Sequence, residues 1–176
     1  MLKWCREYEI RTLSMWGFST DNAKRNPEEI QKLFGLFKKY LAEAMEENQK
    51  TSAEEKKKYN VRIRFLGRRM LFPREIQDAM NKIEGLTKNN KNYTLNLLLG
   101  YGGHEEIVDA VNALLREGKK EVDEKDIENR LYTAGQEHPD LVIRTSGEQR
   151  LSGLLPWQTV YSELHFSKKL WQDFGK

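Results

Sequence analysis

The sequence has few of the features that mark secreted, membrane-spanning or zinc-binding proteins. Cys5 is the only cysteine among 176 residues, which excludes an internal disulfide framework and a cysteine-rich zinc site. No run approaches the roughly 18 apolar residues of a transmembrane helix, and no signal peptide opens the chain. The net charge is only +3, which argues against a basic tail that binds nucleic acid. We therefore expect a soluble cytoplasmic protein.

Common nucleotide-binding and acyl-transfer motifs are also missing. There is no Walker A sequence, the run Gly100-Tyr101-Gly102 has no glycine at position 105, and no Gly-x-Ser-x-Gly turn occurs. The three histidines lie far apart and have no cysteine companions, which argues against zinc. These absences argue against dinucleotide enzymes, serine hydrolases and zinc proteins.

Strand-like and helix-like patterns alternate along the whole chain, which has the length of one domain, residues 1–176. The pattern predicts strands at residues 10–18, 61–66, 93–99, 141–143 and 160–166. It predicts helices from Asn26 to about Asn48, from Pro73, after residues 100–103, and from Asp123 to about Tyr132. This order indicates an α/β fold, a single domain with a mainly parallel central sheet flanked by helices.

Polar residues collect after the predicted strands, where ligands of parallel sheets bind. Arg144, Arg150 and Ser152 follow the fourth strand, and paired arginines with a hydroxyl suit a phosphate group. The alternative is an ordinary surface loop with salt bridges to Glu148. Ser19 and Asn22 follow the first strand, where such residues more often serve as turn and cap residues. Two strand ends therefore carry candidate ligand groups.

Glu163 lies inside an otherwise apolar predicted strand, where a carboxylate is costly unless it is paired or bound to metal. If it is a ligand, Mg²⁺ is the natural ion, because hard oxygen donors and phosphates suit it. An edge strand with Glu163 facing solvent is the alternative. Composition and spacing alone thus indicate an α/β domain that handles a phosphorylated ligand.

Three segments resemble motifs of a known family. Residues 140–152 (DLVIRTSGEQRLS), with Trp157-Gln158 and residues 161–166 (YSELHF), resemble the isoprenyl diphosphate signature of the cis-prenyltransferases, the undecaprenyl diphosphate synthase family. Residues 17–25 (GFSTDNAKR) are similar to a second motif, and Asn96 with residues 101–103 to a third. The resemblance is collinear over essentially the whole chain.

The resemblance implies an Mg²⁺-dependent transferase that condenses isopentenyl diphosphate with an allylic diphosphate to form Z-polyprenyl diphosphate. Asn22 matches the residue near the departing proton, and because an amide is a poor base, we expect it to position substrate or water. Glu163 matches the Mg²⁺ ligand. The implied substrate-binding residues are Ser19, Thr20, Asp21, Arg25, Arg144, Arg150, Leu151 and Ser152.

The resemblance also bears on partners. Family members are typically homodimers, so a homodimer is implied, with no nucleic-acid partner. The product is a lipid, so we expect transient, peripheral contact with the membrane. In the family an apolar cavity holds the growing chain. The helical stripe of Phe34, Phe37, Leu41 and Met45 is a candidate lining, although such a stripe is core in most proteins.

One departure from the family raises a second hypothesis. Members open with a strand that leads into an Asp-Gly-Asn loop, whereas residues 1–9 match only the tail of the helix that follows. We therefore expect a domain that lacks the first strand-loop-helix unit and is incomplete at both ends. The chain is then either a shortened cis-prenyltransferase or a non-catalytic, complementing subunit of a heteromeric one. A nucleic-acid binder using Arg62, Arg64, Arg68 and Arg69 is disfavoured by the balanced charge.

Overall fold

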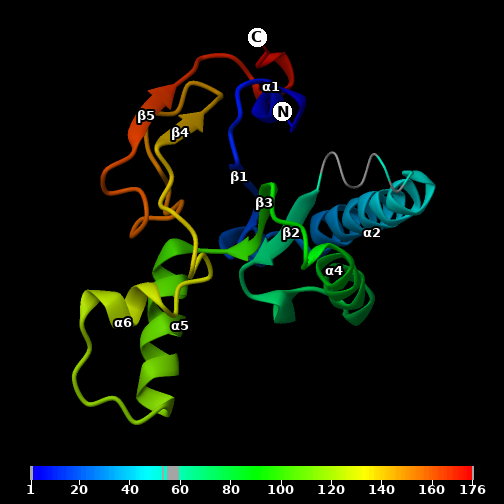
Figure 1. Ribbon diagram of the computed structural model, residues 1–176. Helices are drawn as coiled ribbons and strands as arrows, with labels where there is room; N and C mark the ends of the chain where they lie inside the picture. The colour runs from blue at the N-terminus through cyan, green and yellow to red at the C-terminus, as the bar shows by residue number, and fades with distance from the viewer. Residues whose placement is uncertain (1, 53, 55–59, 176) are drawn as a thin grey trace. The chain divides into compact units, whose positions relative to one another are not determined.

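The computed structural model describes residues 2–52, 54 and 60–175. The chain divides into two compact units, Met1–Tyr101 and Gly102–Lys176, and each is described by itself. In the first unit, strands and helices alternate (Figure 1). Its elements are α1 (Leu2–Glu7), β1 (Thr12–Ser19), η1 (Asp21–Lys24), α2 (Pro27–Lys50), β2 (Val61–Leu66), η2 (Arg69–Leu71), α4 (Arg74–Thr87) and β3 (Tyr93–Tyr101).

The sheet of the first unit has the order β1-β3-β2, and all its neighbours run parallel. β3 is the central strand, and most of its side chains are buried, which confirms the prediction of a buried strand from residue 93. β3 continues beyond the predicted end to Tyr101, which is fully buried. A central parallel strand is covered on both faces, so its near-continuous apolar sequence follows from its place in the sheet.

α2 begins where the sequence predicts. The Asn26 side chain accepts a hydrogen bond from the Glu28 backbone N–H at 2.9 Å, and Pro27 occupies the first turn. Phe34 is buried against Phe18 and Phe72, with ring centroids 5.5 Å apart for the pair Phe34–Phe72. The apolar stripe of α2 therefore belongs to the hydrophobic core in this structure, together with residues of β1 and α4.

Gly67 allows the ends of β2 and β3 to approach closely. Its φ is +130°, and a Cβ atom there would lie 2.3 Å from the Leu99 carbonyl oxygen. Only glycine tolerates both conditions. The neighbouring Arg68 N–H donates to the Gly100 carbonyl oxygen at 3.0 Å. The carboxyl ends of these strands are thus fixed by backbone contacts.

The second unit contains a two-stranded parallel sheet. Its elements are α5 (Gly103–Arg116), α6 (Glu124–Glu128), β4 (Leu141–Arg144), β5 (Glu163–Phe166) and η3 (Trp171–Asp173). β4 pairs with β5 so that Leu141 lies opposite Glu163 and Arg144 opposite Phe166. Across the chain, helices and parallel strands occur together, which confirms the predicted α/β class.

Two predicted elements of the second unit are shorter than expected. The helix expected over residues 123–132 ends at Glu128, because turns follow in which Leu131 and Thr133 become buried. The strand expected from residue 160 begins at Glu163, since the Ser162 N–H donates to the Thr159 carbonyl oxygen in a turn. The Ser162 hydroxyl also donates to the Pro139 carbonyl oxygen, so in both places tertiary contacts override the local pattern.

Within the part of the chain that the structure describes, no helix combines the length and apolar character needed to cross a bilayer.

Candidate active site

Ser19 and Asn22, at the end of β1, hold each other through reciprocal hydrogen bonds. The Ser19 backbone N–H donates to Asn22 Oδ1 at 2.9 Å, and the Asn22 N–H donates to Ser19 Oγ at 3.0 Å. Each side chain satisfies a backbone donor at the start of η1, as in a capping box. Ser19 and Asn22 therefore do serve as turn and cap residues, the alternative that the sequence left open.

The same bonds decide what Asn22 still offers to a ligand. Its acceptor Oδ1 is engaged by Ser19, whereas the amide Nδ2 makes no hydrogen bond to any residue the structure describes. Asn22 thus presents N–H donors, while its oxygen already accepts one hydrogen bond. Such a group is suited to an oxyanion and unsuited to removing a proton.

Charged residues surround this turn. Asp21 accepts a hydrogen bond from Lys24 Nζ at 2.7 Å, which holds the pKa of that exposed carboxyl below its usual value. Arg25 forms an exposed ion pair with Glu29 at 2.5 Å. Thr20 is fixed by its backbone N–H, which donates to the Tyr101 carbonyl oxygen at 3.1 Å. The turn therefore lies at the carboxyl ends of β1 and β3.

A second polar group lies in the loop after β4, residues 144–155. Arg144 donates to Ser152 Oγ at 2.8 Å and also to the carbonyl oxygen of Arg150. Arg150 forms an ion pair with Glu148, and both side chains are exposed. Arg144, Arg150 and Ser152 are therefore brought together, with Leu151 half-buried between them. The salt bridge to Glu148 that the alternative interpretation expected is also present.

The backbone of the 144–155 loop is held in an unusual shape. Ser146, Ser152 and Leu155 all have positive φ, the last two at 51° and 45°. Non-glycine residues adopt such angles at a cost, commonly at functional sites. Two backbone hydrogen bonds connect the loop to the segment after β5. The Ser146 N–H donates to the Lys169 carbonyl oxygen, and the Gly147 N–H donates to the Ser167 carbonyl oxygen.

Glu163 does not join this group along the sheet. It is exposed at the beginning of β5, opposite Leu141, while Arg144 lies opposite Phe166. The Glu163 and Arg144 positions are therefore three residues apart along the strand direction, which corresponds to about 10 Å. Among the described residues, no three His, Cys, Asp or Glu side chains form a cluster that could hold a metal. Mg²⁺ nevertheless often takes only one or two carboxylates and completes its shell with water and phosphate oxygens, so Glu163 fits that chemistry.

Sequence reasoning missed a buried polar pair in the second unit, Glu106 and Gln158. Glu106 is fully buried and Gln158 is 2% exposed. The signal was present, because Glu106 occupies the same helical stripe as Gly103, Ala110 and Leu114, all buried residues of α5. A carboxylate on such a stripe requires partners.

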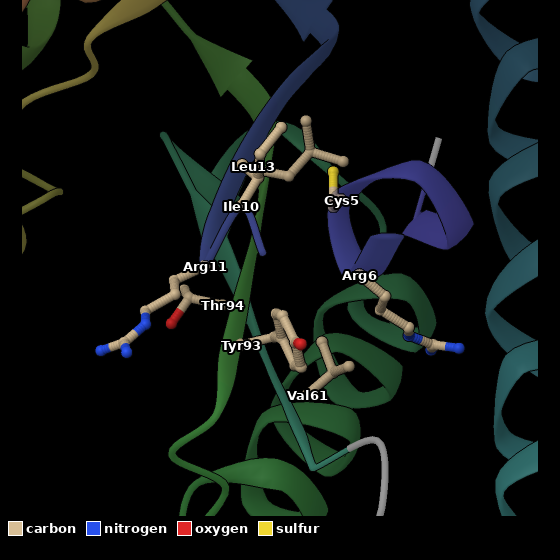
Figure 2. A pocket seen from close by; sticks show the side chains of 8 residues that line it. All are labelled: Cys5, Arg6, Ile10, Arg11, Leu13, Val61, Tyr93 and Thr94. Carbon is tan, nitrogen blue, oxygen red and sulfur yellow. The ribbon is translucent and has the colours of Figure 1, made fainter. Parts of the chain in front are cut away.

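In the first unit, a small hollow lies at the amino-terminal ends of β1, β2 and β3, whereas the turn at residues 19–22 lies at the carboxyl ends. Figure 2 shows that Cys5, Ile10 and Leu13 gather at it, while the Arg6 and Arg11 side chains extend away to either side. Apolar side chains contribute most of its wall. It is small and offers no converging cations, so it is no candidate for a diphosphate.

Comparison with known proteins decides the family. The family model described as putative undecaprenyl diphosphate synthase matches residues 1–176. The chain belongs to the undecaprenyl diphosphate synthase family. The resemblance seen in the motifs is thereby confirmed.

Individual members of this family are similar over the whole chain. The isoprenyl transferase of Thermus thermophilus is 47% identical over 186 residues, covering 100% of this chain and 68% of the relative. The tritrans,polycis-undecaprenyl-diphosphate synthase (geranylgeranyl-diphosphate specific) of Thermococcus kodakarensis is 40% identical, with 100% and 67% covered.

Two solved structures share the fold. Lavandulyl diphosphate synthase from Lavandula x intermedia, in complex with dimethylallyl diphosphate, has a TM-score of 0.83 and 32% identity, with 97% of this chain and 73% of that chain covered. A probable undecaprenyl diphosphate synthase from Campylobacter jejuni has a TM-score of 0.83 and 30% identity, with 99% and 78% covered.

Proposed function

We propose that this chain condenses isopentenyl diphosphate with an allylic diphosphate and forms a Z-polyprenyl diphosphate. In the reaction a carbon–carbon bond forms between the two substrates, the diphosphate group leaves the allylic carbon, and isopentenyl diphosphate loses one proton. The observation that carries the proposal is the grouping of Arg144, Arg150 and Ser152 on one loop after a parallel strand. Membership of a family of prenyl diphosphate synthases supports it.

In this proposal the 144–155 loop binds the diphosphate of isopentenyl diphosphate. Arg144 is already bonded to Ser152 and to the Arg150 carbonyl, so it shapes the loop and adds positive charge. Arg150 exchanges Glu148 for the phosphate, and Ser152 Oγ donates its hydroxyl proton to a phosphate oxygen. Leu151 contributes to the same loop. Charge-assisted bonds from arginine to phosphate are stronger than neutral ones, which favours this exchange.

In the first unit, Asn22 donates from Nδ2 to a substrate oxygen or to a water near the departing proton. An amide is a poor base, so the proton passes to another oxygen, such as a diphosphate oxygen or water. Ser19 fixes the amide, and Arg25 adds positive charge once it leaves Glu29. Thr20 and Asp21 form the same substrate-contacting turn.

Mg²⁺ is the cofactor that we propose, with Glu163 as its protein ligand. When bound, the ion neutralises charge on the diphosphate oxygens. Glu163 is exposed and therefore accessible to an ion carried in by a diphosphate.

We further propose that residues 1–176 belong to a single domain of this family, because one family model matches all of them. The remaining proposals are a cytoplasmic homodimer and a transient, peripheral contact with the membrane as the lipid product grows.

Arg150→Ala tests the phosphate role. We expect the dissociation constant for isopentenyl diphosphate to rise about 10-fold or more, because a charge-assisted bond worth about 1.5–3 kcal/mol is lost. Isothermal titration measures it. Arg74→Ala is the charge-matched control, since Arg74 is an exposed residue of α4 paired with Asp78. Equal affinities of Arg150→Ala and the native protein would refute the assignment.

Glu163→Gln tests the metal role without changing side-chain size. We expect the Mg²⁺ concentration for half-maximal activity to rise about 10-fold, because an anionic oxygen ligand is replaced by a neutral one. A metal titration of the initial rate measures this. Glu137→Gln, at an exposed position of the same unit, is the control. Superimposable titrations of Glu163→Gln and the native protein would exclude Glu163 as a ligand.

A further inference from the structure

The second unit buries a carboxylate that the proposed chemistry does not use. Glu106 lies in the first turn of α5 and is fully buried. Its Oε1 accepts the Tyr132 backbone N–H at 2.7 Å. Gln158 Nε2 donates to both of its oxygens, at 3.2 and 3.1 Å. The carboxylate thus bonds two segments that are distant from it in the sequence.

Gln158 extends this network to a third side chain. Its Nε2 also donates to Thr133 Oγ1 at 2.9 Å. The NH₂ group of the amide faces the carboxylate, because the nitrogen is the side of an amide that donates and both carboxylate oxygens accept from it. One buried amide therefore joins α5 and residues 132–133 to the segment that connects Ser152 with Glu163.

The segment after Ser152 is held against α5 at a second place. A Cβ atom on Gly103 would lie 2.3 Å from the Gly153 carbonyl oxygen and 2.4 Å from Pro156 Cδ. Leu155 is buried, and its carbonyl oxygen accepts both the N–H and the hydroxyl of Thr159. Residues 153–159 thus form a tightly packed anchor directly behind Ser152.

The exposed part of the 144–155 loop depends on such an anchor. Ser152 has a positive φ. The Arg150 side chain is more than half exposed and pairs with Glu148, and the Arg150 carbonyl oxygen accepts a hydrogen bond from Arg144. A strained backbone conformation persists only when its surroundings impose it. The buried anchor begins at the residue after Ser152, so it contributes to imposing that conformation together with the Arg144 bond to Ser152.

We propose that Glu106 and Gln158 are positioning residues for phosphate recognition. Their hydrogen bonds hold residues 153–159 on α5, so that Arg150 and Ser152 meet the same anion. Neither residue touches the substrate. This inference rests on the proposed function, because it gives the pair a role in binding isopentenyl diphosphate.

Gln158→Leu removes the donor and keeps the approximate size. We expect KM for isopentenyl diphosphate to rise about 10-fold with kcat within about 3-fold, because leaving a buried polar partner unpaired costs enough to displace the loop. Tyr132→Phe is the structural control. It removes the 2.5 Å bond from Tyr132 Oη to Asp109 but keeps the backbone N–H that Glu106 accepts, so its KM should stay native.

A swap of the two side chains separates positioning from stability. Gln158→Glu alone sets two carboxylates together and should raise KM at least as much as Gln158→Leu. The double variant Glu106→Gln/Gln158→Glu restores one donor and one acceptor. Its new amide on α5 keeps an oxygen for the Tyr132 N–H, and its new carboxylate accepts the Thr133 hydroxyl. We expect it to return KM to within about 3-fold of native, since the same pairings are formed.

Outcomes separate this inference from the proposed function. If the intact native protein neither binds nor elongates isopentenyl diphosphate, the proposed function fails. If the native protein works and Gln158→Leu keeps a native KM, only the positioning role fails. If Gln158→Leu does not fold, the double variant Glu106→Gln/Gln158→Glu decides. A folded double variant whose KM is as high as that of Gln158→Glu overturns the proposal. A native KM of the double variant supports it.

Discussion

Asn22→Ala is expected to lower kcat for prenyl transfer by about 10²–10³-fold, the loss typical for one donor that stabilises developing charge. The substitution removes the Nδ2 donor and also the acceptor of the Ser19 N–H. Initial rates at saturating substrates measure kcat, and circular dichroism reports whether the fold persists.

Two further variants, Asn22→Asp and Ser19→Ala, separate the loss of the Nδ2 donor from the loss of the hydrogen bonds within the turn. The aspartate keeps an oxygen for the Ser19 N–H but presents an acceptor where the amide presented donors. Ser19→Ala keeps the Asn22 donor and loses only the acceptor of the Asn22 N–H. We expect Asn22→Asp to be as impaired as Asn22→Ala, and Ser19→Ala to lose about 10-fold, about the value of one hydrogen bond. An Asn22→Asp variant with native or higher kcat would contradict the donor role and indicate a proton acceptor.

Gly103→Ala is expected to destabilise the protein by about 1–3 kcal/mol or more and to raise KM for isopentenyl diphosphate. The new Cβ would collide with the Gly153 carbonyl and the Pro156 ring, neither of which is a flexible side-chain end. Either α5 or the anchor behind Ser152 must move. Chemical denaturation measures the free energy of unfolding, and steady-state kinetics measure KM.

Gly85→Ala is the matched control for this substitution. Gly85 lies inside α4, and nothing lies within 4 Å of its added Cβ. Alanine there should stabilise the protein by about 0.5–1 kcal/mol through helix propensity. If Gly103→Ala were as stable as Gly85→Ala, with a native KM, the close packing of the loop on α5 would be refuted.

Features set by neighbouring residues were predictable from the sequence. β2 has the predicted bounds, and the Asn26-Pro27 start of α2 is as expected, because a cap depends on residues a few positions apart. The bounds of α6 and β5 were not predictable, because they depend on contacts between residues far apart in the sequence. Leu131 is buried after α6, and at β5 the Ser162 hydroxyl and the Glu163 N–H donate to the carbonyl oxygens of Pro139 and Asp140.

The candidate site was predictable in composition and less so in geometry. Arg144 and Ser152 were expected to act together, and they are bonded to each other. The register that places Glu163 opposite Leu141 could not be predicted, because it is a pairing between two strands that lie far apart in the sequence. The engaged Oδ1 of Asn22 was likewise invisible in the motif, since the motif gives residue types and no hydrogen-bond partners.

The central claim is prenyl transfer, and the most direct test is turnover by the intact protein. It would be incubated with labelled isopentenyl diphosphate, an allylic diphosphate and Mg²⁺, and the product analysed by mass spectrometry and by NMR of the new double bonds. We predict Mg²⁺-dependent addition of five-carbon units, one diphosphate released for each, and Z geometry at every new bond. Binding of isopentenyl diphosphate without elongation, or elongation with E geometry, would contradict this account.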